Sequence, residues 1–333
     1  MLRLDFNENT IGPSPLVAQA LRNFSTEEIA VYPEYDGLRD ALLQNLLETG
    51  CRPGLKPDQV GLFNGVDAAI HAVFQAYGDA GETLLTTAPT FGYYSPCAGM
   101  QGMTIEAIPY QGETFDFPLA AIQQALEAQA PRLLLICNPN NPTGTWIPGS
   151  EIRRLREGLP DDTLLVIDCA YGEFVDAPDY EDPLALVEEY DNTVVTRTFS
   201  KIHGLAGLRL GWMYGRKDIV DVIHRVRGPF NVNLPAIEAG TAAIQDRDFL
   251  KKSKEHNDQS LAFLTQQLGG LGYDVTPSVC NFVLVHFPET PGETADDANK
   301  FLAERGLIVR GVQPYGLPNA LRISVGLEEH NRA

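Results

Sequence analysis

The chain has 333 residues, of which 44% are hydrophobic and 21% charged, as is usual for a globular protein with one large domain or two unequal domains. Its formal net charge of −19 argues against partners such as nucleic acid or an anionic membrane surface, because both require clustered lysine and arginine. No run of residues approaches the ~20 apolar positions needed to span a bilayer. The first residues, MLRLDFNENT, do not resemble a secretory signal, so we expect a cytoplasmic protein.

The first two thirds of the chain alternate short apolar runs with helical patterns. Helices are expected at 37–48, where leucines recur every four residues, and at 67–77. Because several apolar runs show no polar alternation, we expect them to be strands buried on both faces of a mostly parallel sheet in an α/β domain. The runs that predict strands are 60–63, 83–87, 104–108, 133–137, 164–168, 194–198 and 210–214.

After residue 235 the pattern changes to that of a smaller α+β domain. We expect a long helical region at 236–268, a helix at 295–304, and strands at 281–287, 307–310 and 321–325. The predicted large domain is residues 31–235, and the predicted small domain is residues 236–333 together with an N-terminal arm, residues 1–30. We expect the arm to pack on the small domain.

The cysteines and histidines give no support for a metal site or a disulfide framework. The five cysteines are odd in number, widely spaced and without a CxxC pair; they are Cys51, Cys97, Cys137, Cys169 and Cys280. The six histidines show neither HxxxH nor HExxH spacing. We therefore predict no metal, and we expect the thiols at the ends of apolar runs, Cys137 and Cys169, to be buried.

Polar residues follow three successive strand candidates at the point where each one ends. Asn141 lies in the loop NPNNPTG, Asp168 ends its strand with Tyr171 three residues later, and Lys201 follows the next strand. Taken singly, each has a structural explanation, such as a turn or a buried salt bridge at Asp168. Because ligands of parallel sheets bind beyond the carboxyl ends of the strands, we expect these side chains to share one site.

Two further stretches are suited to binding an anion. Gly65 allows a tight turn before a helix for which Asp67 is expected to be the N-cap, and a helix N-terminus attracts anions, although alone this is an ordinary turn. Thr198, Ser200 and Arg209 add two hydroxyls and a guanidinium. Neither a P-loop nor a GxGxxG motif is present.

Pyridoxal phosphate is one ligand that would use all these groups. It needs an amine for its aldehyde, a carboxylate for its pyridine nitrogen, donors for its ring oxygen O3′ and an anion site for its phosphate. The pKa of a lysine in apolar surroundings is lowered, which suits Lys201 to Schiff-base chemistry.

Ten motifs in order along nearly the whole chain resemble one family. The sequence is similar to fold-type I pyridoxal phosphate enzymes with an aspartate aminotransferase-like fold, and specifically to the histidinol-phosphate aminotransferase subfamily. The motifs are LDFNENTIGPSP (4–15), YPEYDGLRDAL (32–42), NGVDAAI (64–70), APTFGYY (88–94), NPNNPTG (138–144), DCAYGEF (168–174), TFSKIHGLAGLRLG (198–211), PFNVN (229–233), NFVLV (281–285) and LRISVG (321–326). The fold implied is a large domain with a mostly parallel seven-stranded sheet covered by helices, plus a smaller α+β domain.

The resemblance implies catalytic and cofactor-binding roles for matching residues. Lys201 would hold the cofactor covalently and shuttle the proton, Asp168 would keep the pyridine nitrogen protonated, and Tyr171 would hydrogen-bond O3′ together with Asn141. The other implied cofactor contacts are Phe91 on the ring face, the phosphate ligands Val66, Asp67, Thr198, Ser200 and Arg209, and Tyr32 donated by the neighbouring subunit of a homodimer.

The implied activity is transamination of small-molecule amino and 2-oxo substrates. Arg322 would bind a substrate carboxylate and Arg310 a distal phosphate, with Asn9 also at the substrate. The donor would be histidinol phosphate or glutamate and the acceptor 2-oxoglutarate or imidazole acetol phosphate, as in histidine biosynthesis. An aromatic or pathway-specific aminotransferase, a phosphothreonine decarboxylase and a non-catalytic ligand sensor remain alternatives. The chain departs from relatives at Thr10, Ile11 and His203.

Overall fold

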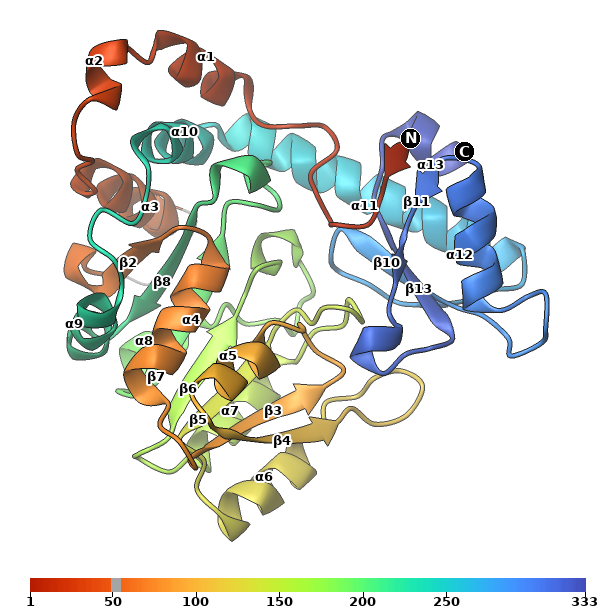
Figure 1. The fold of residues 1–333 in the computed structure, drawn as a ribbon, viewed down its shortest axis with the longest axis horizontal. Coiled ribbons are helices and arrows are strands. Elements are labelled where there is room, and N and C mark those ends of the chain that lie inside the picture. The colour runs from red at the N-terminus through yellow and green to blue at the C-terminus, as the bar shows by residue number, and fades with distance from the viewer. Residues whose placement is uncertain (49–54) are drawn as a thin grey trace.

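The structure, a computed structural model, describes residues 1–48 and 55–333. It contains a larger body built on a seven-stranded sheet and a smaller body that carries both chain termini (Figure 1). Among the described residues, no helix is long and apolar enough to cross a membrane.

The seven-stranded sheet follows the order β2-β8-β7-β6-β5-β3-β4. Neighbouring strands are parallel except at β8, which is antiparallel to both β2 and β7. All seven predicted strands are confirmed, with ends that move by at most one residue. They are β2 (Val60–Phe63), β3 (Thr83–Ala88), β4 (Thr104–Pro109), β5 (Leu133–Cys137), β6 (Leu164–Asp168), β7 (Thr193–Thr198) and β8 (Gly211–Gly215).

Both faces of this sheet are covered by helices, which explains why its central strands are apolar throughout. Leu133 and Leu135 of β5 belong to the core on one face, while Leu134 and Ile136 belong to the core on the other. The first core includes residues of α4 (Val66–Tyr77), α5 (Tyr94–Met100) and α9 (Lys217–Val226). The second includes residues of α3 (Asp36–Glu48), α6 (Leu119–Ala128), α7 (Gly149–Glu157) and α8 (Leu184–Glu189), among them the predicted apolar stripe of α3.

The smaller body is built on a four-stranded antiparallel sheet of order β12-β13-β10-β9, flanked by helices (Figure 1). A two-stranded parallel pair, β1 with β11, joins the start of the chain to it. The strands are β1 (Leu2–Arg3), β9 (Asp274–Thr276), β10 (Phe282–His286), β11 (Leu307–Ile308), β12 (Arg310–Gly311) and β13 (Ala320–Ser324). The helices are α11 (Arg247–Gly270), α12 (Ala295–Glu304) and α13 (Glu328–Arg332).

Two predictions for this region were wrong in detail. The single helical region at 236–268 is two helices, α10 (Leu234–Gln245) and α11, because Asp246 leaves the helical conformation and caps α11 by accepting the Phe249 amide. The strand at 307–310 is also two strands, because β11 pairs with β1 whereas β12 pairs with β13.

The N-terminal arm contacts both bodies. Leu4 donates its amide to the Ile308 carbonyl in the smaller body. Farther along, α1 (Pro15–Asn23) packs on α10, which packs on α3 of the larger body, and α2 (Thr26–Ile29) follows. The division into residues 31–235 and residues 1–30 with 236–333 stays a prediction.

Candidate active site

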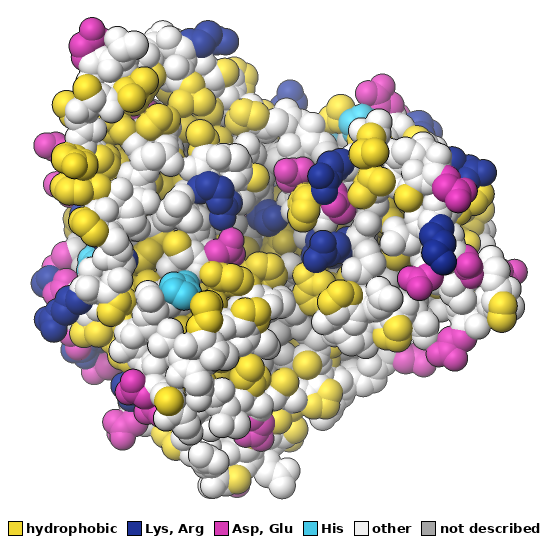
Figure 2. All heavy atoms as spheres, in the orientation of Figure 1, with side chains coloured by type: hydrophobic (Ala, Val, Ile, Leu, Met, Phe, Trp, Pro, Cys, Tyr) yellow, Lys and Arg dark blue, Asp and Glu magenta, His cyan; other side chains and the backbone are white. Residues whose placement is uncertain are grey.

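A cavity of about 320 Å³ lies where β5, β6 and β7 end, between the two bodies. Its lining brings together twelve of the predicted site residues, namely Val66, Asp67, Phe91, Asn141, Asp168, Tyr171, Thr198, Ser200, Lys201, Arg209, Arg310 and Arg322. Figure 2 shows lysine and arginine side chains around the hollow between the two bodies. Four cations and three carboxylates line the cavity, in a chain whose net charge is −19.

Asp168 is a buried carboxylate that faces this cavity, with a side chain 1% exposed. Tyr94 donates its hydroxyl to Oδ2 over 2.8 Å, and Thr196 donates its hydroxyl to Oδ1 over 3.1 Å. Within the described chain no lysine, arginine or histidine forms an ion pair with Asp168, so the alternative of a structural salt bridge is not supported. Burial raises the pKa of Asp168 from 3.8 to about 6, and the two hydroxyl donors oppose that rise. A ligand with a cationic nitrogen would compensate this charge.

Sequence reasoning missed both hydroxyl donors. Tyr94 is fully buried at the start of α5, where its ring meets the Phe91 ring edge-on at 5.6 Å between centroids. Thr196 lies on β7 directly opposite Asp168 in the parallel register. The alternation of β7 could have indicated Thr196, because it is two residues before the predicted ligand Thr198 and therefore shares its face.

Lys201 lies three residues beyond β7 and reaches into the cavity. Its Nζ donates to the Phe6 carbonyl of the N-terminal arm over 2.9 Å and lies 5.7 Å from the centre of the Tyr171 ring. Burial, and then the nearby Arg322 guanidinium, lower the pKa of Lys201 from 10.5 to about 8. A substantial fraction of this amine is therefore neutral at mildly alkaline pH, as nucleophilic attack on an aldehyde requires.

An anion site lies at the N-terminus of α4. Gly65 precedes the helix with φ of 83° and no side-chain cap, so the first amides of α4 are not satisfied by a capping side chain. Arg209 donates to Asp67 over 3.1 Å, and a Cβ built on Gly65 would lie 2.5 Å from the Arg209 Nη2. The prediction that Asp67 is the N-cap was wrong, because the left-handed Gly65 holds that position and α4 begins at Val66.

Two arginines from the smaller body enter the opposite side of the cavity. Arg310 and Arg322 are directly opposed in the antiparallel register of β12 and β13. Arg322 is buried, donates to the Asn141 Oδ1 over 2.5 Å and to the Asp5 carbonyl over 2.7 Å, and its Nε has no hydrogen-bond partner in the described chain. This pair can bind anionic groups of a substrate.

Two predicted residues do not line the cavity. The Asn9 amide donates to the Ile202 carbonyl over 2.7 Å and to Ser253 over 3.1 Å, so its part in substrate binding stays a prediction. Tyr32 is 77% exposed and stacks on Phe230, with ring centroids 4.3 Å apart. Its predicted role concerns a neighbouring subunit.

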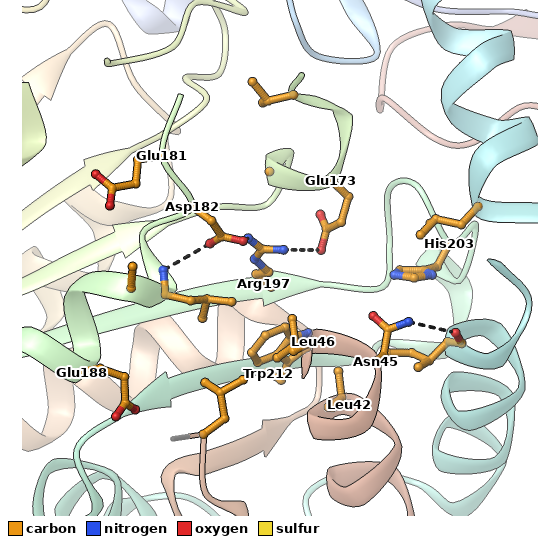
Figure 3. A pocket seen from close by; sticks show the side chains of 17 residues that line it. Leu42, Asn45, Leu46, Glu173, Glu181, Asp182, Glu188, Arg197, His203 and Trp212 are labelled. Carbon is orange, nitrogen blue, oxygen red and sulfur yellow. Dashed lines mark hydrogen bonds and ion pairs between the residues drawn. The ribbon is translucent and has the colours of Figure 1, made fainter. Parts of the chain in front are cut away.

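A second cavity, of about 470 Å³, lies behind β7 (Figure 3). There Arg197 forms ion pairs with Glu173 over 3.3 Å and with Asp182 over 2.7 Å. His203 lies in the same region against the Phe199 ring, and burial lowers its pKa to about 4, so the ring is neutral. The structure thus places this unusual residue away from the predicted cofactor ligands, on the reverse side of the Lys201 loop.

The cysteines agree with their predicted structural role. Cys137 and Cys169 are buried free thiols, while Cys51 lies outside the described residues. In the described ranges, no group of three or more His, Cys, Asp or Glu residues could hold a metal ion.

Comparison with known proteins gives matches along the full chain. A family model described as aminotransferase class I and II matches residues 1–333. The histidinol-phosphate aminotransferase of Maricaulis maris (strain MCS10) is 50% identical, with 99% of this chain and 89% of the relative covered. That of Rhodopseudomonas palustris (strain BisB18) is 41% identical, with 100% and 88% covered.

Solved structures give the same result. The histidinol-phosphate aminotransferase of Sinorhizobium meliloti, in complex with pyridoxal-5'-phosphate, matches with a TM-score of 0.88 and 26% identity over 99% of this chain and 88% of that one. The L-threonine-O-3-phosphate decarboxylase of Porphyromonas gingivalis shares the fold, with a TM-score of 0.81 and 23% identity over 100% and 96%. The fold and family expected from the motifs are thereby confirmed: the chain belongs to the class I and II aminotransferase family.

Proposed function

We propose that this aminotransferase uses pyridoxal 5'-phosphate to move an amino group between histidinol phosphate or glutamate and 2-oxoglutarate or imidazole acetol phosphate, in histidine biosynthesis. The observation that best supports pyridoxal phosphate as the cofactor is the buried Asp168. Its carboxylate accepts hydrogen bonds from two hydroxyls and faces the same cavity as Lys201. Relatives named histidinol-phosphate aminotransferase, 41–50% identical over nearly the whole chain, support the substrate class.

The residues of the cavity fit this cofactor from one end to the other. Lys201 would bind it covalently, Asp168 would pair with its pyridine nitrogen, and Asn141 would hydrogen-bond O3′ alongside Tyr171. The anion site would receive the phosphate through the Val66 and Asp67 amides, Thr198, Ser200 and Arg209, with Phe91 against the ring. When bound, the protonated ring withdraws electrons from the substrate Cα.

Lys201 would also move the proton at the substrate Cα. Its lowered pKa, near 8, makes the neutral amine available as a general base once the substrate amine has taken its place. The amine is already at the reacting carbon, so no second base has to be brought into place.

Substrate recognition would come from the opposed arginines. Arg322 is the candidate for a substrate carboxylate, and it would exchange its contacts with Asn141 and the Asp5 carbonyl for that carboxylate. Arg310 lines the cavity beside it and is the candidate for the distal phosphate.

We also propose that two copies of the chain form the active unit. Apolar side chains are exposed around Tyr32, namely Ile29, Val31 and Phe230, at 68%, 60% and 52% exposure. Burial of this patch against a second copy is favourable, and the Tyr32 hydroxyl would then reach the cofactor phosphate of the neighbour.

The test is a half-reaction followed by absorbance. Purified enzyme with cofactor should show a visible band that bleaches with histidinol phosphate and returns with 2-oxoglutarate. Borohydride reduction and peptide mass spectrometry should locate the cofactor on Lys201, and Lys201→Ala should abolish both signals.

The same half-reaction is run with glutamate, phenylalanine and O-phosphothreonine as alternative amino donors. No response to histidinol phosphate refutes the leading substrate, while carbon dioxide release from O-phosphothreonine supports the decarboxylase alternative. Cofactor binding without turnover supports a ligand sensor.

A further inference from the structure

Asn7 is a buried residue of the N-terminal arm that connects the smaller body to the cavity. Its side chain is 1% exposed and lines the cavity, and its backbone has a φ of 55° in the left-handed region. The Asn281 amide donates to the Asn7 carbonyl over 2.9 Å and fixes the backbone of the arm. The Asn7 side chain lies between Ser324 of β13 and the Tyr171 hydroxyl, each at 2.9 Å.

The hydrogen bonds around Asn7 determine which way each proton points. The Asn7 backbone N–H donates to the Ser324 hydroxyl oxygen over 2.9 Å, and a backbone N–H cannot act as an acceptor. Ser324 in turn donates its own proton to the Asn7 Oδ1, so the amide oxygen of Asn7 lies on the Ser324 side. The other end of the Asn7 amide must then be the NH2 group, which donates to the Tyr171 hydroxyl oxygen.

The Tyr171 hydroxyl consequently accepts from Asn7 and keeps its proton for another partner. The edge of its ring is fixed against Phe282, with centroids 5.4 Å apart and planes at 82°. Burial raises the pKa of Tyr171, so the hydroxyl remains protonated. Its proton can be donated only away from Asn7, and Tyr171 lines the cavity with Lys201 and Asn141.

We propose that Asn7 is a positioning residue that makes Tyr171 a hydrogen-bond donor toward the cavity, and that Ser324 sets the orientation of the Asn7 amide. This inference rests on the proposed function, because the acceptor would be the ring oxygen O3′ of the cofactor. A donor at this point stabilises negative charge on that oxygen. The pH at which the visible band of the bound cofactor changes is therefore lower with the Tyr171 proton than without it.

Asn7→Asp is the sharpest test, because aspartate has nearly the same shape and tolerates the left-handed backbone. Its carboxylate can only accept, so the Tyr171 proton turns toward residue 7 and away from the cofactor. The pH midpoint of the band should rise by about one unit. A carboxylate also acts through its charge, so the same substitution is made in Tyr171→Phe. There the charge effect persists, and the hydroxyl effect is absent.

The expected result is a larger midpoint shift in the wild-type background than in the Tyr171→Phe background. Equal shifts in both backgrounds would show that only charge acts, and would overturn the proposal. Asn257→Asp is the matched control for a buried charge, since Asn257 is also buried and donates to the Cys280 carbonyl but makes no hydrogen bond with Tyr171. Its midpoint should change by the charge effect alone, and by the same amount in the Tyr171→Phe background.

Ser324→Ala provides a second, uncharged route to the same readout. Without Ser324 the Asn7 amide is free to turn its oxygen toward Tyr171, so the midpoint should rise, though less than in Asn7→Asp. If Asn7→Asp does not fold, an unchanged midpoint in Ser324→Ala overturns the inference. The variants are compared only after the wild type shows a visible band that titrates with pH. Absence of that band in the wild type refutes the proposed function. A titrating wild-type band with unchanged midpoints in the variants refutes this inference alone.

Discussion

The two faces of β7 hold acidic side chains in opposite ways. On the face toward the active-site cavity, Asp168 is held by the Thr196 and Tyr94 hydroxyls and forms no ion pair among the described residues. On the reverse face, Arg197 is buried and pairs with Glu173 and Asp182 (Figure 3). Thr196 and Arg197 are consecutive residues, so the alternation of one strand separates the two arrangements.

The difference teaches how to distinguish a functional buried acid from a structural one. At Arg197 the protein supplies the compensating charges itself, so no ligand is needed to balance the guanidinium. At Asp168 the partners are neutral donors, which orient the carboxylate but leave its charge for a ligand to compensate. Substitutions on the cavity face should therefore alter chemistry, and those on the reverse face should alter stability.

The largest effect is expected for Asp168→Asn. The amide keeps the shape but cannot hold the pyridine nitrogen protonated, so cofactor should remain bound while turnover falls about 10³-fold. Single-turnover absorbance with histidinol phosphate measures this loss, and the band of the bound cofactor checks retention. Near-normal turnover would refute the role of Asp168.

Arg197→Met tests the reverse face. Glu173 and Asp182 lose a buried partner, so the free energy of unfolding should drop by about 3 kcal/mol, with kcat per folded molecule unchanged. The pKa of Glu173 is already raised by burial, and loss of the cation raises it further. Since the folded state then holds a proton that the unfolded state releases, the destabilisation should grow as pH rises. Urea unfolding at several pH values measures this loss of stability, with Arg197→Lys as the milder control. A loss of kcat without a loss of stability would contradict the structural role of the reverse face.

Tyr94→Phe removes one donor from Asp168 and should slow turnover about tenfold. In cofactor-free protein the pKa of Asp168, already about 6, should rise further, because the hydroxyl favours the ionised form. The wild type should lose stability as pH rises from the ordinary aspartate pKa toward 6, and the variant should continue to lose it at higher pH. Chemical unfolding at several pH values shows this window.

Tyr180→Phe is the matched control for that experiment. The Tyr180 hydroxyl is buried on the reverse side near Arg197, without a hydrogen-bond partner in the described chain. Its removal should leave the pH dependence of stability unchanged. A similar shift in both variants would mean that tyrosine burial, and not the bond to Asp168, is responsible.

The smallest effect is expected for Glu173→Gln. The glutamine can still accept a hydrogen bond from Arg197, which keeps its ion pair with Asp182, so the loss should be about 1 kcal/mol or less. Thermal unfolding measures it. A loss as large as that of Arg197→Met would show that Glu173 alone compensates the guanidinium.

The sequence predicted elements well where one local pattern decided the outcome. Apolar runs located the central strands of the large sheet, since strands buried on both faces need no partner to be recognised, and the largely exposed edge strand β4 was located as well. Element boundaries were harder to predict. β11 and β12 are separate strands because they pair with different partners, which the sequence does not show. The helical periodicity continued across Asp246, so the break between α10 and α11 was missed.

The same distinction applies to the site. Asn141, Asp168 and Lys201 could be predicted because strand ends meet at one edge of a sheet. Tyr94 was hidden because it reaches Asp168 from a helix rather than from a strand end. Within the arm motif, Asn9 was predicted to be the site residue, but Asn7 is the one that lines the cavity. The sequence could not distinguish them, because the left-handed backbone at Asn7 cannot be inferred from residue type alone.

The contrast between the cavity and the rest of the surface has a kinetic consequence. An anionic substrate in solution meets the field of a molecule of charge −19 before it reaches the four cations lining the cavity. Repulsion at long range is screened first by salt, because the Debye length is ~10 Å at 0.1 M and longer in dilute buffer. Substrate capture should therefore become faster as salt is added from low ionic strength, the reverse of what electrostatic steering by a uniformly basic enzyme would produce.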